Sequence, residues 1–372
     1  MSTKYNHVKE KIKSKILEGF FEPHEKIGSE SDLMAEHKVS RHTVRKAIDN
    51  LANEGWLYKK QGAGTFCADR TLDKEPSMGA VKNIAVITTY FSDYIFPTII
   101  RGAEGYLSEN GYQVTVFSTN NNIEQERRCL ETILSQKFYG LIVEPTKSAL
   151  PNPNINYYLN IERLGIPYVM INAYYEELEP IHLIMDDVEG GFQQTNHLIE
   201  LGHQHILGFF KNDDIQGTKR MKGFIQAHRK SGLPVSPQNI ITYTTETKNT
   251  TPIEELLLKM KKKEQIPTAI VCYNDQLALN LLNVLRDLEI SVPEQISLVG
   301  FDDSFLSVAS EVKLTTIKHP QVKMGEDAAK TILKLIKQKY ESSENGVVPS
   351  IKYCPKLVVR KSTKEQEKIE LN

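Results

Sequence analysis

The stretch that decides the fold near the N-terminus is SESDLMAEHKVSRHTVRKAIDNLANEGWLYKKQGAGTFCA, residues 29–68. Its first four residues, Ser29–Asp32, have the composition of a helix capping box, so a short helix is expected to follow. Ser40 can cap a second helix, which Gly55 ends. The apolar stripe of that second helix repeats at helical spacing and consists of Val44, Ala47, Ile48 and Leu51.

A hairpin and an earlier helix complete this unit. Residues 56–60 and 65–67 have the composition of two strands, and Gln61–Gly64 is expected at the tip between them. Upstream, residues 5–16 carry apolar side chains at helical spacing. Three helices followed by a glycine-tipped hairpin predict a winged helix-turn-helix, which we place at residues 1–68.

The helix that Ser40 caps is predicted to read DNA, because donor groups lie opposite its apolar stripe. Arginine can give two hydrogen bonds to a guanine in the major groove, while lysine and threonine reach phosphates. Glycines in the wing allow the backbone to approach a groove. The alternative is an ordinary solvated basic face. The predicted DNA-binding residues are Arg41, His42, Thr43, Arg45, Lys46, Gln61, Gly62 and Gly64.

The pattern of apolar and polar residues changes after residue 68. Residues 69–82 lose all periodicity and are interpreted as a linker. In residues 83–372, apolar runs alternate with helical stretches, which predicts an α/β domain of parallel sheets with covering helices. The charged tail from Lys361 onward is expected to be frayed. The predicted strands are 84–87, 141–143, 168–171, 206–210, 269–271 and 297–299.

Composition narrows the class of protein. The 372 residues carry a net charge of -1 and are 40% hydrophobic, which is ordinary for a soluble protein of two or three domains. No apolar run approaches the roughly 20 residues that span a bilayer, and the polar N-terminus lacks the apolar core of a secretory signal. The four cysteines are scattered, which argues against zinc sites and disulfides. We expect a cytoplasmic protein without a metal or cofactor.

Four local features of residues 83–372 predict a ligand cleft. The aromatic cluster 90–96 follows the first predicted strand, where open α/β sheets bind ligands. Arg220 lies in KRMKGF, and Asn274 and Asp302 follow later strands. Such side chains offer donors and acceptors to the vicinal hydroxyls of a sugar, although Asx residues after strands also cap helices.

Two family resemblances extend these expectations. Residues 29–68 resemble the GntR-type winged-helix domain, because they meet almost completely its pattern E-x-x-L-x-x-x-x-x-V-S-R-x-T-V-R-x-A-I, followed by E-G-x-L and G-x-G-T-F. The resemblance implies that Arg41, Thr43, Arg45 and Gly64 approach DNA. It also implies that Lys4, at the start of the first helix, lies beside the DNA backbone.

Residues 82–360 resemble the sugar-binding domain of LacI/GalR-type regulators, most diagnostically in PTAIVCYNDQLALNLLNVLRDLEISVPEQISLVGFDDS and LTTIKHPQVKMGEDAAKTIL. This resemblance implies two lobes joined by three crossover segments, with the sugar between them. It also implies a homodimer that presents two readers to a palindromic operator. The residues implied to line the cleft are Phe96, Arg220, Asn274, Asp302 and His319, with Asp93, Tyr94, Glu144, Lys147 and Asp187 as further candidates in loops of variable length.

The combination of the two domains is similar to the arabinose-operon repressors of Gram-positive bacteria, which implies a transcriptional repressor released by L-arabinose. A sugar that acts as corepressor or activator stays open, as does an α/β enzyme acting on a sugar. A secreted sugar-uptake protein is a further alternative. Gly62–Gly64 is not a dinucleotide fingerprint, and the sequence has no GxxxxGK[ST] motif, so an enzyme is disfavoured.

One departure from the LacI pattern concerns the linker. Residues 69–82 show no hinge-helix sequence with a leucine wedge for the minor groove. The route by which the sugar affects DNA binding therefore cannot be carried over from that family. His203 and His205 lie at a predicted turn without a nearby cysteine or carboxylate cluster and do not indicate a metal site.

Overall fold

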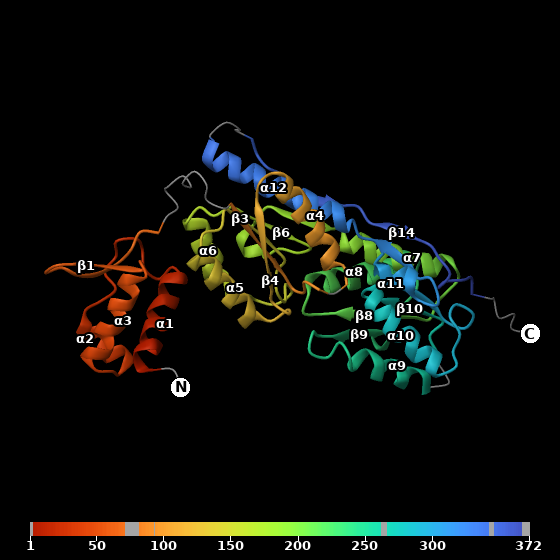
Figure 1. The fold of residues 1–372 in the computed structure, drawn as a ribbon. Coiled ribbons are helices and arrows are strands. Elements are labelled where there is room, and N and C mark those ends of the chain that lie inside the picture. The colour runs from red at the N-terminus through yellow and green to blue at the C-terminus, as the bar shows by residue number, and fades with distance from the viewer. Residues whose placement is uncertain (1–2, 71–81, 93, 262–265, 342–345, 367–372) are drawn as a thin grey trace, which may run out of the picture.

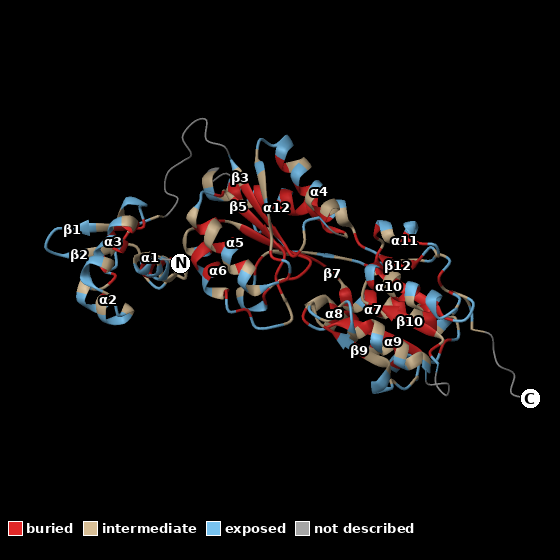
Figure 2. Ribbon diagram, turned by 60° about the horizontal axis from the view of Figure 1, so that its bottom comes forward, coloured by how far each residue is buried: buried red, intermediate tan, exposed pale blue. Residues whose placement is uncertain are grey.

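The computed structural model describes residues 3–70, 82–92, 94–261, 266–341 and 346–366. A winged helix, an N lobe and a C lobe follow one another along an elongated molecule (Figure 1). Burial is concentrated in the sheets of the two lobes, whereas the wing is exposed (Figure 2). Within the described ranges, no helix combines the length and apolar character needed to cross a membrane. Most of the predicted linker, 71–81, lies outside the described residues.

The winged helix has the predicted order of elements. Ser29 forms the capping box with Asp32, and Ser40 accepts the amide of Thr43 at the start of the next helix. The predicted tip is one residue too long, because Gly64 already pairs with Lys60 in the hairpin. The elements are α1 (Lys4–Leu17), α2 (Glu30–His37), α3 (Arg41–Asn53), β1 (Leu57–Lys60) and β2 (Gly64–Cys67).

The N lobe is built on a parallel sheet of order β13-β7-β6-β5-β3-β4. Helices α4 and α12 pack on one face of the sheet, and α5 and α6 cover the other. The strands are β3 (Asn83–Thr88), β4 (Gln113–Ser118), β5 (Gly140–Val143), β6 (Tyr168–Ile171), β7 (His182–Met185) and β13 (Ile351–Tyr353). The helices are α4 (Phe96–Glu109), α5 (Ile123–Ser135), α6 (Ile155–Arg163), α12 (Gln321–Glu341) and the short η1 (Glu176–Leu178).

The C lobe repeats this layered plan with the order β14-β12-β11-β10-β8-β9. Edge strand β14 runs antiparallel to β12, so this sheet is mixed and not purely parallel as predicted. The strands are β8 (Ile206–Lys211), β9 (Ile240–Tyr243), β10 (Ala269–Cys272), β11 (Ser297–Asp302), β12 (Thr315–Lys318) and β14 (Lys356–Val358). The helices are α7 (Asp187–Glu200), α8 (Ile215–Lys230), α9 (Thr251–Lys261), α10 (Asp275–Asp287), α11 (Phe305–Ala309) and the short η2 (Pro237–Asn239).

The chain passes between the lobes three times, after β7, after β12 and after β13. All six strands predicted from apolar runs are present, and the other strands of both sheets were not predicted because they are short or partly polar. The two-lobed α/β fold implied by the resemblance is therefore confirmed.

The predicted fraying of the tail is wrong for residues 361–366. Ser362 is completely buried, and its carbonyl accepts the amide of Leu298 at 2.7 Å. The amide of Gln366 donates to the carbonyl of Leu201 at 2.8 Å. The charged composition concealed these contacts, because they use backbone groups and a hydroxyl and not the charged side chains.

Candidate functional sites

The first candidate site is the exposed N-terminal half of α3. Arg41 and Arg45 are one helical turn apart, and each side chain is 59% exposed. Both guanidinium groups face the carboxylate of Glu30 in α2, with nitrogen–oxygen distances of 3.6 and 2.8 Å. Because exposed ion pairs are weak, DNA can compete with Glu30 for both arginines.

Other predicted DNA-binding residues surround this pair. Lys4 and Thr43 line the same surface groove between α1, α2 and α3. The hydroxyl of Thr43 lies 2.9 Å from that of Ser40 at the N-terminus of α3. Lys46 places its ammonium 4.1 Å from the centre of the Tyr5 ring, whereas His42 is exposed to solvent.

The wing supplies the remaining predicted positions. Gln61 and Gly62 are exposed at its tip, and Gly62 has a φ of 74° that favours glycine. Gly64 has a φ of 124°, and a Cβ there would lie 2.7 Å from the side chain of Lys26. The Lys26 side chain is flexible and can move aside, so it is the backbone conformation at position 64 that favours glycine, in addition to the predicted approach to DNA.

The second candidate site is a cavity of about 120 Å³ between the two lobes. It lies at the carboxyl ends of the parallel strands, as predicted for an open α/β fold. Asp93 lies outside the described residues, and Lys147 does not line the cavity but pairs with Glu246 of the C lobe. The predicted residues that do line it are Tyr94, Phe96, Glu144, Asp187, Arg220, Asn274, Asp302 and His319.

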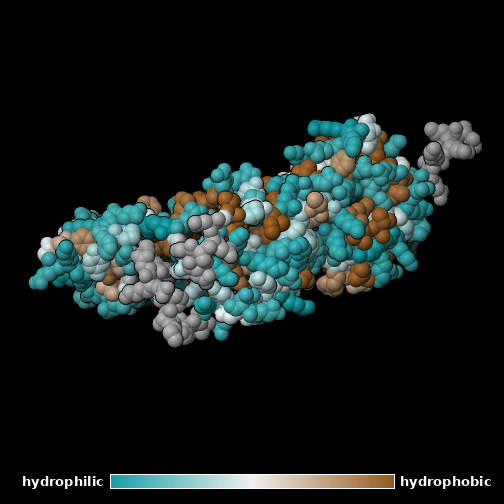
Figure 3. Space-filling model, turned by 90° about the horizontal axis from the view of Figure 1, so that it is seen from above, coloured by the Kyte–Doolittle hydropathy of each residue, from teal (hydrophilic) through white to brown (hydrophobic). Residues whose placement is uncertain are grey.

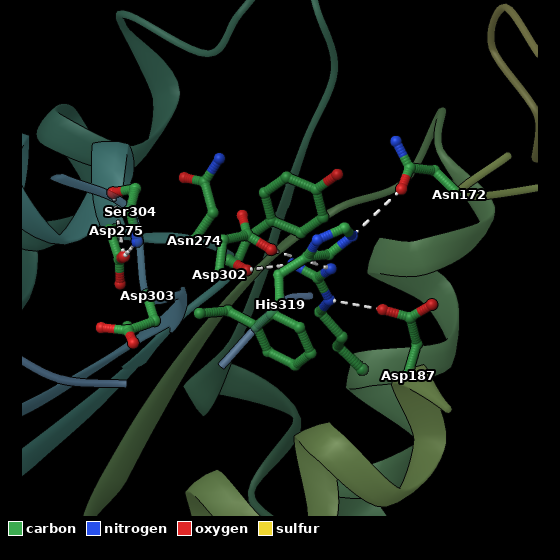
Figure 4. A network of polar contacts seen from close by, with 12 residues as sticks. Asn172, Asp187, Asn274, Asp275, Asp302, Asp303, Ser304 and His319 are labelled. Atoms are coloured by element: carbon green, nitrogen blue, oxygen red, sulfur yellow. Dashed lines mark hydrogen bonds and ion pairs between the residues drawn. The ribbon is translucent and has the colours of Figure 1, made fainter. Parts of the chain in front are cut away.

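Arg220 is the centre of the charged network in this cavity. It comes from helix α8, and it is only 4% exposed. Its Nε donates to Asp187 at 2.8 Å, and its terminal nitrogens lie 2.6 Å from the carbonyl of Tyr273 and 3.6 Å from Asp302. Its guanidinium also stacks on the Phe301 ring at 3.4 Å. Figure 4 shows Asp187 and Asp302 on different sides of the polar network.

Close packing of α7 and α8 holds Arg220 in place. A Cβ at Gly191 would meet the Arg220 carbonyl at 2.2 Å, and one at Gly223 would meet the Val188 carbonyl at 2.1 Å. Glycine at these two positions therefore allows the close approach of α7 and α8. Burial raises the pKa of the Asp187 carboxyl to about 6, although Arg220 opposes this shift.

A second network surrounds Glu144. Its carboxyl accepts hydrogen bonds from the amide and hydroxyl of Thr89 and from the side-chain amide of Asn172. Burial raises the pKa of Glu144 to about 7. The side-chain oxygen of Asn172 lies 3.1 Å from Nε2 of His319. Because an amide oxygen can only accept, Nε2 of His319 carries the proton.

The His319 ring therefore presents its Nδ1 as an acceptor. This buried atom has no hydrogen-bond partner in the described part of the chain. Burial lowers the pKa of His319 to about 4, so the ring is neutral at physiological pH. An unpaired acceptor in a cavity rich in donors and carboxylates suits a ligand hydroxyl.

Asp302 and Asn274 combine structural and cavity-facing roles. Asp302 has a φ of 97° and accepts the Tyr94 hydroxyl at 2.7 Å, a bond that joins the two lobes. The Asn274 oxygen accepts the amide of Leu277 at 2.9 Å and caps α10, so the capping alternative applies to it as well. Figure 4 shows Asn274, Asp302 and His319 close together at the cavity.

Several cavity residues were missed from the sequence. Lys211 is 6% exposed, and its ammonium lies 2.6 Å from Asp214. Burial alone would lower the pKa of Lys211, but the carboxylates of Asp214 and Asp213 raise it overall. The available signal was a lysine that ends the apolar run 206–210. Asn172, which directly follows the predicted strand 168–171, carried a similar signal.

Comparison with known proteins agrees with both parts of the fold. Residues 4–67 match the model of bacterial regulatory proteins of the gntR family, and residues 195–363 match the periplasmic binding protein-like domain. A LacI family transcriptional regulator from Enterococcus faecium, solved with bound ribose, has a TM-score of 0.62 at 23% identity and covers 77% of this chain and 100% of its own.

Two curated relatives match nearly the whole chain. An arabinose metabolism transcriptional repressor from Halalkalibacterium halodurans is 68% identical over 366 residues, which are 98% of both proteins. A protein of the same name from Geobacillus stearothermophilus is 48% identical over 365 residues, 97% of this chain and 98% of that protein. The prediction of a transcriptional regulator, not an enzyme, is confirmed by these relatives.

Proposed function

Because this chain belongs to the family of arabinose metabolism transcriptional repressors, we propose that L-arabinose binds its cleft and releases it from operator DNA. The winged helix binds the operator in the cytoplasm through Lys4, α3 and the wing. The sugar favours the closed arrangement of the lobes, and closure lowers operator affinity. A ligand can shift this equilibrium only by its difference in affinity for the two forms.

The observation that carries the proposal is the cavity between the lobes. Its volume of about 120 Å³ is on the scale of the ~150 Å³ cavity that holds a single benzene ring, which favours one sugar ring over an oligosaccharide. Its lining combines carboxylates, amides and cations with the rings of Tyr90 and Phe96. Such rings suit the apolar faces of a sugar, and the polar groups suit its hydroxyls.

We further propose that the repressor is a homodimer on a palindromic operator. Phe305 and Val308 are 65% and 48% exposed and lie three residues apart on α11, hence on one face of that helix. Apolar side chains gather in patches over the lobes, whereas the winged helix is mostly hydrophilic in the same view (Figure 3). Sedimentation equilibrium is expected to show a dimer for the wild type and a shift toward monomer for Phe305→Asp. A monomeric wild type, both free and on operator DNA, would exclude the homodimer.

The sugar assignment is tested by operator titrations with and without L-arabinose. The wild type is expected to lose operator affinity by roughly 10- to 100-fold when the sugar saturates it. Asp302→Ala removes hydroxyl acceptors and is expected to abolish this response while DNA binding without sugar stays intact. If the Asp302→Ala variant is released from operator DNA at the same L-arabinose concentration as the wild type, the cleft assignment is wrong. Tighter operator binding of the wild type with sugar would reverse the direction of the switch.

A further inference from the structure

We propose that the face of the N lobe formed by α5 and α6 is a docking surface for the winged helix of the same chain, and that docking belongs to the closed form of the cleft. This inference rests on the proposed function, because it describes how the sugar reaches the DNA reader. It supplies a route that does not require a hinge helix, which the linker sequence lacks. Figure 1 shows α1 as the part of the winged helix nearest to α6.

The docking contact is built at the C-terminal end of α1. The last carbonyls of a helix have no partners within the helix. Asn160 of α6 supplies them, since its side-chain amide donates to the carbonyls of Leu17 at 2.7 Å and Ile16 at 3.3 Å. Arg163, one turn further along α6, donates to the carbonyl of Phe21 at 3.2 Å. Asn160 is only 5% exposed, so these bonds are buried within the contact.

Apolar packing and a buried hydroxyl extend this contact. The Tyr157 side chain is 2% exposed, and its hydroxyl lies 3.2 Å from Glu18 of the winged helix and 3.1 Å from Glu131 of α5. The apolar cores of the two domains join there into one continuous cluster. Its members on either side include Ile16, Leu17, Trp56, Leu134, Tyr157 and Ile161.

Docking leaves the DNA-reading surface open. Helix α1 has 14 residues and is therefore about 20 Å long, with Lys4 at one end and the docked Leu17 at the other. The wing points away from the N lobe (Figure 1). Docking thus constrains the orientation of the reader without covering it, and in a dimer the orientation determines whether both half-sites can be reached.

The docking helix is the direct continuation of a loop that bridges the cleft. Glu144 lines the cavity at the end of β5, and α6 begins at Ile155. Between them, Lys147 pairs with Glu246 of the C lobe, and Ser148 accepts the amide of Ile215 at 3.0 Å. Lys147 has a φ of 44°, an unfavourable conformation for lysine that the surrounding contacts maintain.

A second bridge supports the same loop. Asn121 accepts the backbone amide of Lys147 at 2.7 Å. Its side-chain amide donates across the cleft to Asp214 at 3.0 Å and to Thr245 at 2.6 Å. These bonds require the lobes to be close together, so opening the cleft would remove the restraint on the loop.

A buried carboxylate connects this loop to the docking helices. Glu126 of α5 is completely buried. It accepts the hydroxyls of Tyr158 in α6 at 2.9 Å and of Tyr175 at 2.6 Å, and the side-chain amides of Asn152 and Asn154 at 2.9 and 2.8 Å. The Tyr175 hydroxyl also accepts the backbone amide of Thr146 at 2.9 Å.

The bridged cleft and the docked reader occur together in one structure. Because one loop and one buried cluster connect them, we assign docking to the closed, sugar-bound form. In that form the reader is held in an orientation that does not fit both half-sites. When the cleft opens, the loop and the docking helices lose their shared restraint, and the reader is free to engage the operator.

The test compares the full-length wild type with Asn160→Leu and Tyr157→Phe, which remove docking hydrogen bonds. Tyr168→Phe is the matched control, because its hydroxyl donates to Glu162 within the N lobe at 2.6 Å. Hydrogen–deuterium exchange of peptides covering residues 14–22 reports docking, and titrations with a palindromic operator report DNA affinity. Each measurement is made with and without saturating L-arabinose, and calorimetry determines the affinity of each variant for the sugar.

We expect L-arabinose to slow exchange at residues 14–22 in the wild type and in Tyr168→Phe, but not in Asn160→Leu. Asn160→Leu and Tyr157→Phe should bind sugar and sugar-free operator like the wild type, within about threefold. With sugar, Asn160→Leu should stay on the operator at least about tenfold more tightly than the wild type.

Three results would overturn the inference. Exchange at residues 14–22 that ignores the sugar in the wild type would remove the link between docking and closure. Normal release of Asn160→Leu and Tyr157→Phe by the sugar would show that docking does not transmit the signal. Weaker sugar-free operator binding by Asn160→Leu would assign docking to the DNA-bound form. A wild type that binds no L-arabinose would instead refute the proposed function itself.

Discussion

Arg45 in the DNA reader and Arg220 in the sugar cleft make the same bond in opposite surroundings. Each donates its Nε to one carboxylate oxygen at 2.8 Å, to Glu30 and Asp187 respectively. The Arg45 side chain is 59% exposed, whereas that of Arg220 is 5% exposed. To bind DNA, Arg45 gives up the carboxylate of Glu30. Arg220, in contrast, is held by two carboxylates, a carbonyl and an aromatic ring.

This difference separates a surface that exchanges partners from one that is built in advance. Exposed ion pairs contribute little to stability, so DNA can replace Glu30 at small cost. A buried ion pair has lost its hydration, so removing one partner leaves an uncompensated charge. The reader should therefore tolerate substitutions with little loss of stability, whereas substitutions in the cleft should affect folding and sugar binding together.

The largest effect is expected for Arg220→Ala. It leaves Asp187 and Asp302 buried without their cation, which should destabilise the C lobe by about 3–5 kcal/mol and abolish sugar binding. Urea denaturation of the full-length protein measures the change. Arg286→Ala is the matched control, because its ion pair with Glu311 is exposed. Equal unfolding curves for the two variants would eliminate the distinction between exposed and buried arginines.

The next effect concerns pH and Glu144. Its pKa is raised to about 7 in the folded protein, above its ordinary value of 4.5. The folded state therefore binds the extra proton, and stability falls as pH rises from about 4.5 to about 7. The Glu144→Gln variant has no titratable carboxyl at this position, so it lacks this contribution to the pH dependence of stability. Between about pH 5 and pH 8, the wild type should lose on the order of 2 kcal/mol of unfolding free energy relative to Glu144→Gln. If the unfolding free energies of the wild type and Glu144→Gln change with pH in the same way, burial does not raise the pKa of Glu144.

For the reader, Arg45→Ala is expected to weaken operator binding by roughly 10- to 100-fold and to relax sequence choice, because a base contact is lost. The unfolding free energy should not change measurably. Lys4→Ala should instead weaken operator and random DNA alike and reduce the salt dependence of both. Fluorescence anisotropy with both DNAs at several salt concentrations separates the two. An Arg45→Ala protein with wild-type operator affinity would reject the predicted base contact.

The smallest effect is expected for Glu30→Gln. It frees Arg41 and Arg45 from their shared carboxylate, so operator binding should tighten by less than about fivefold. Asp187→Asn makes the equivalent change in the cleft and should instead abolish the sugar response. If Glu30→Gln affects operator binding as strongly as Arg45→Ala, then Glu30 is part of the reading surface and not merely a partner that DNA displaces.

The sequence predicted best what local signals determine. The capping residues Ser29 and Ser40 and the apolar stripe of α3 predicted the helices of the winged helix, because helix ends depend on neighbouring residues. Strand ends predicted Asn274 and Asp302 at the cavity, since the ends of parallel strands meet at one edge of a sheet. The DNA-binding and sugar-binding roles of these residues stay predictions.

Contacts between distant segments could not be predicted from local patterns. Arg220 is at the cavity because α8 packs on α7 at two glycines, and the spacing of one helix does not reveal its partner. Lys211 was missed because lysine is ordinarily an exposed residue. Its burial depends on ion pairs with the two carboxylates that follow its strand, and a local pattern does not reveal those pairs. The contact between Asn160 and α1 joins segments 143 residues apart, and a polar side chain in α6 gave no signal for it.

The three crossings between the lobes also determine the order in which the molecule can form during translation. The winged helix is complete once β2 leaves the ribosome, but the N lobe must wait for α12 and β13, which follow nearly all of the C lobe. At roughly 5–20 residues per second, a nascent chain would hold a finished reader for roughly 15–60 seconds before the N lobe is complete. A truncated product that ends within the C lobe would therefore carry a DNA reader without a finished sensor.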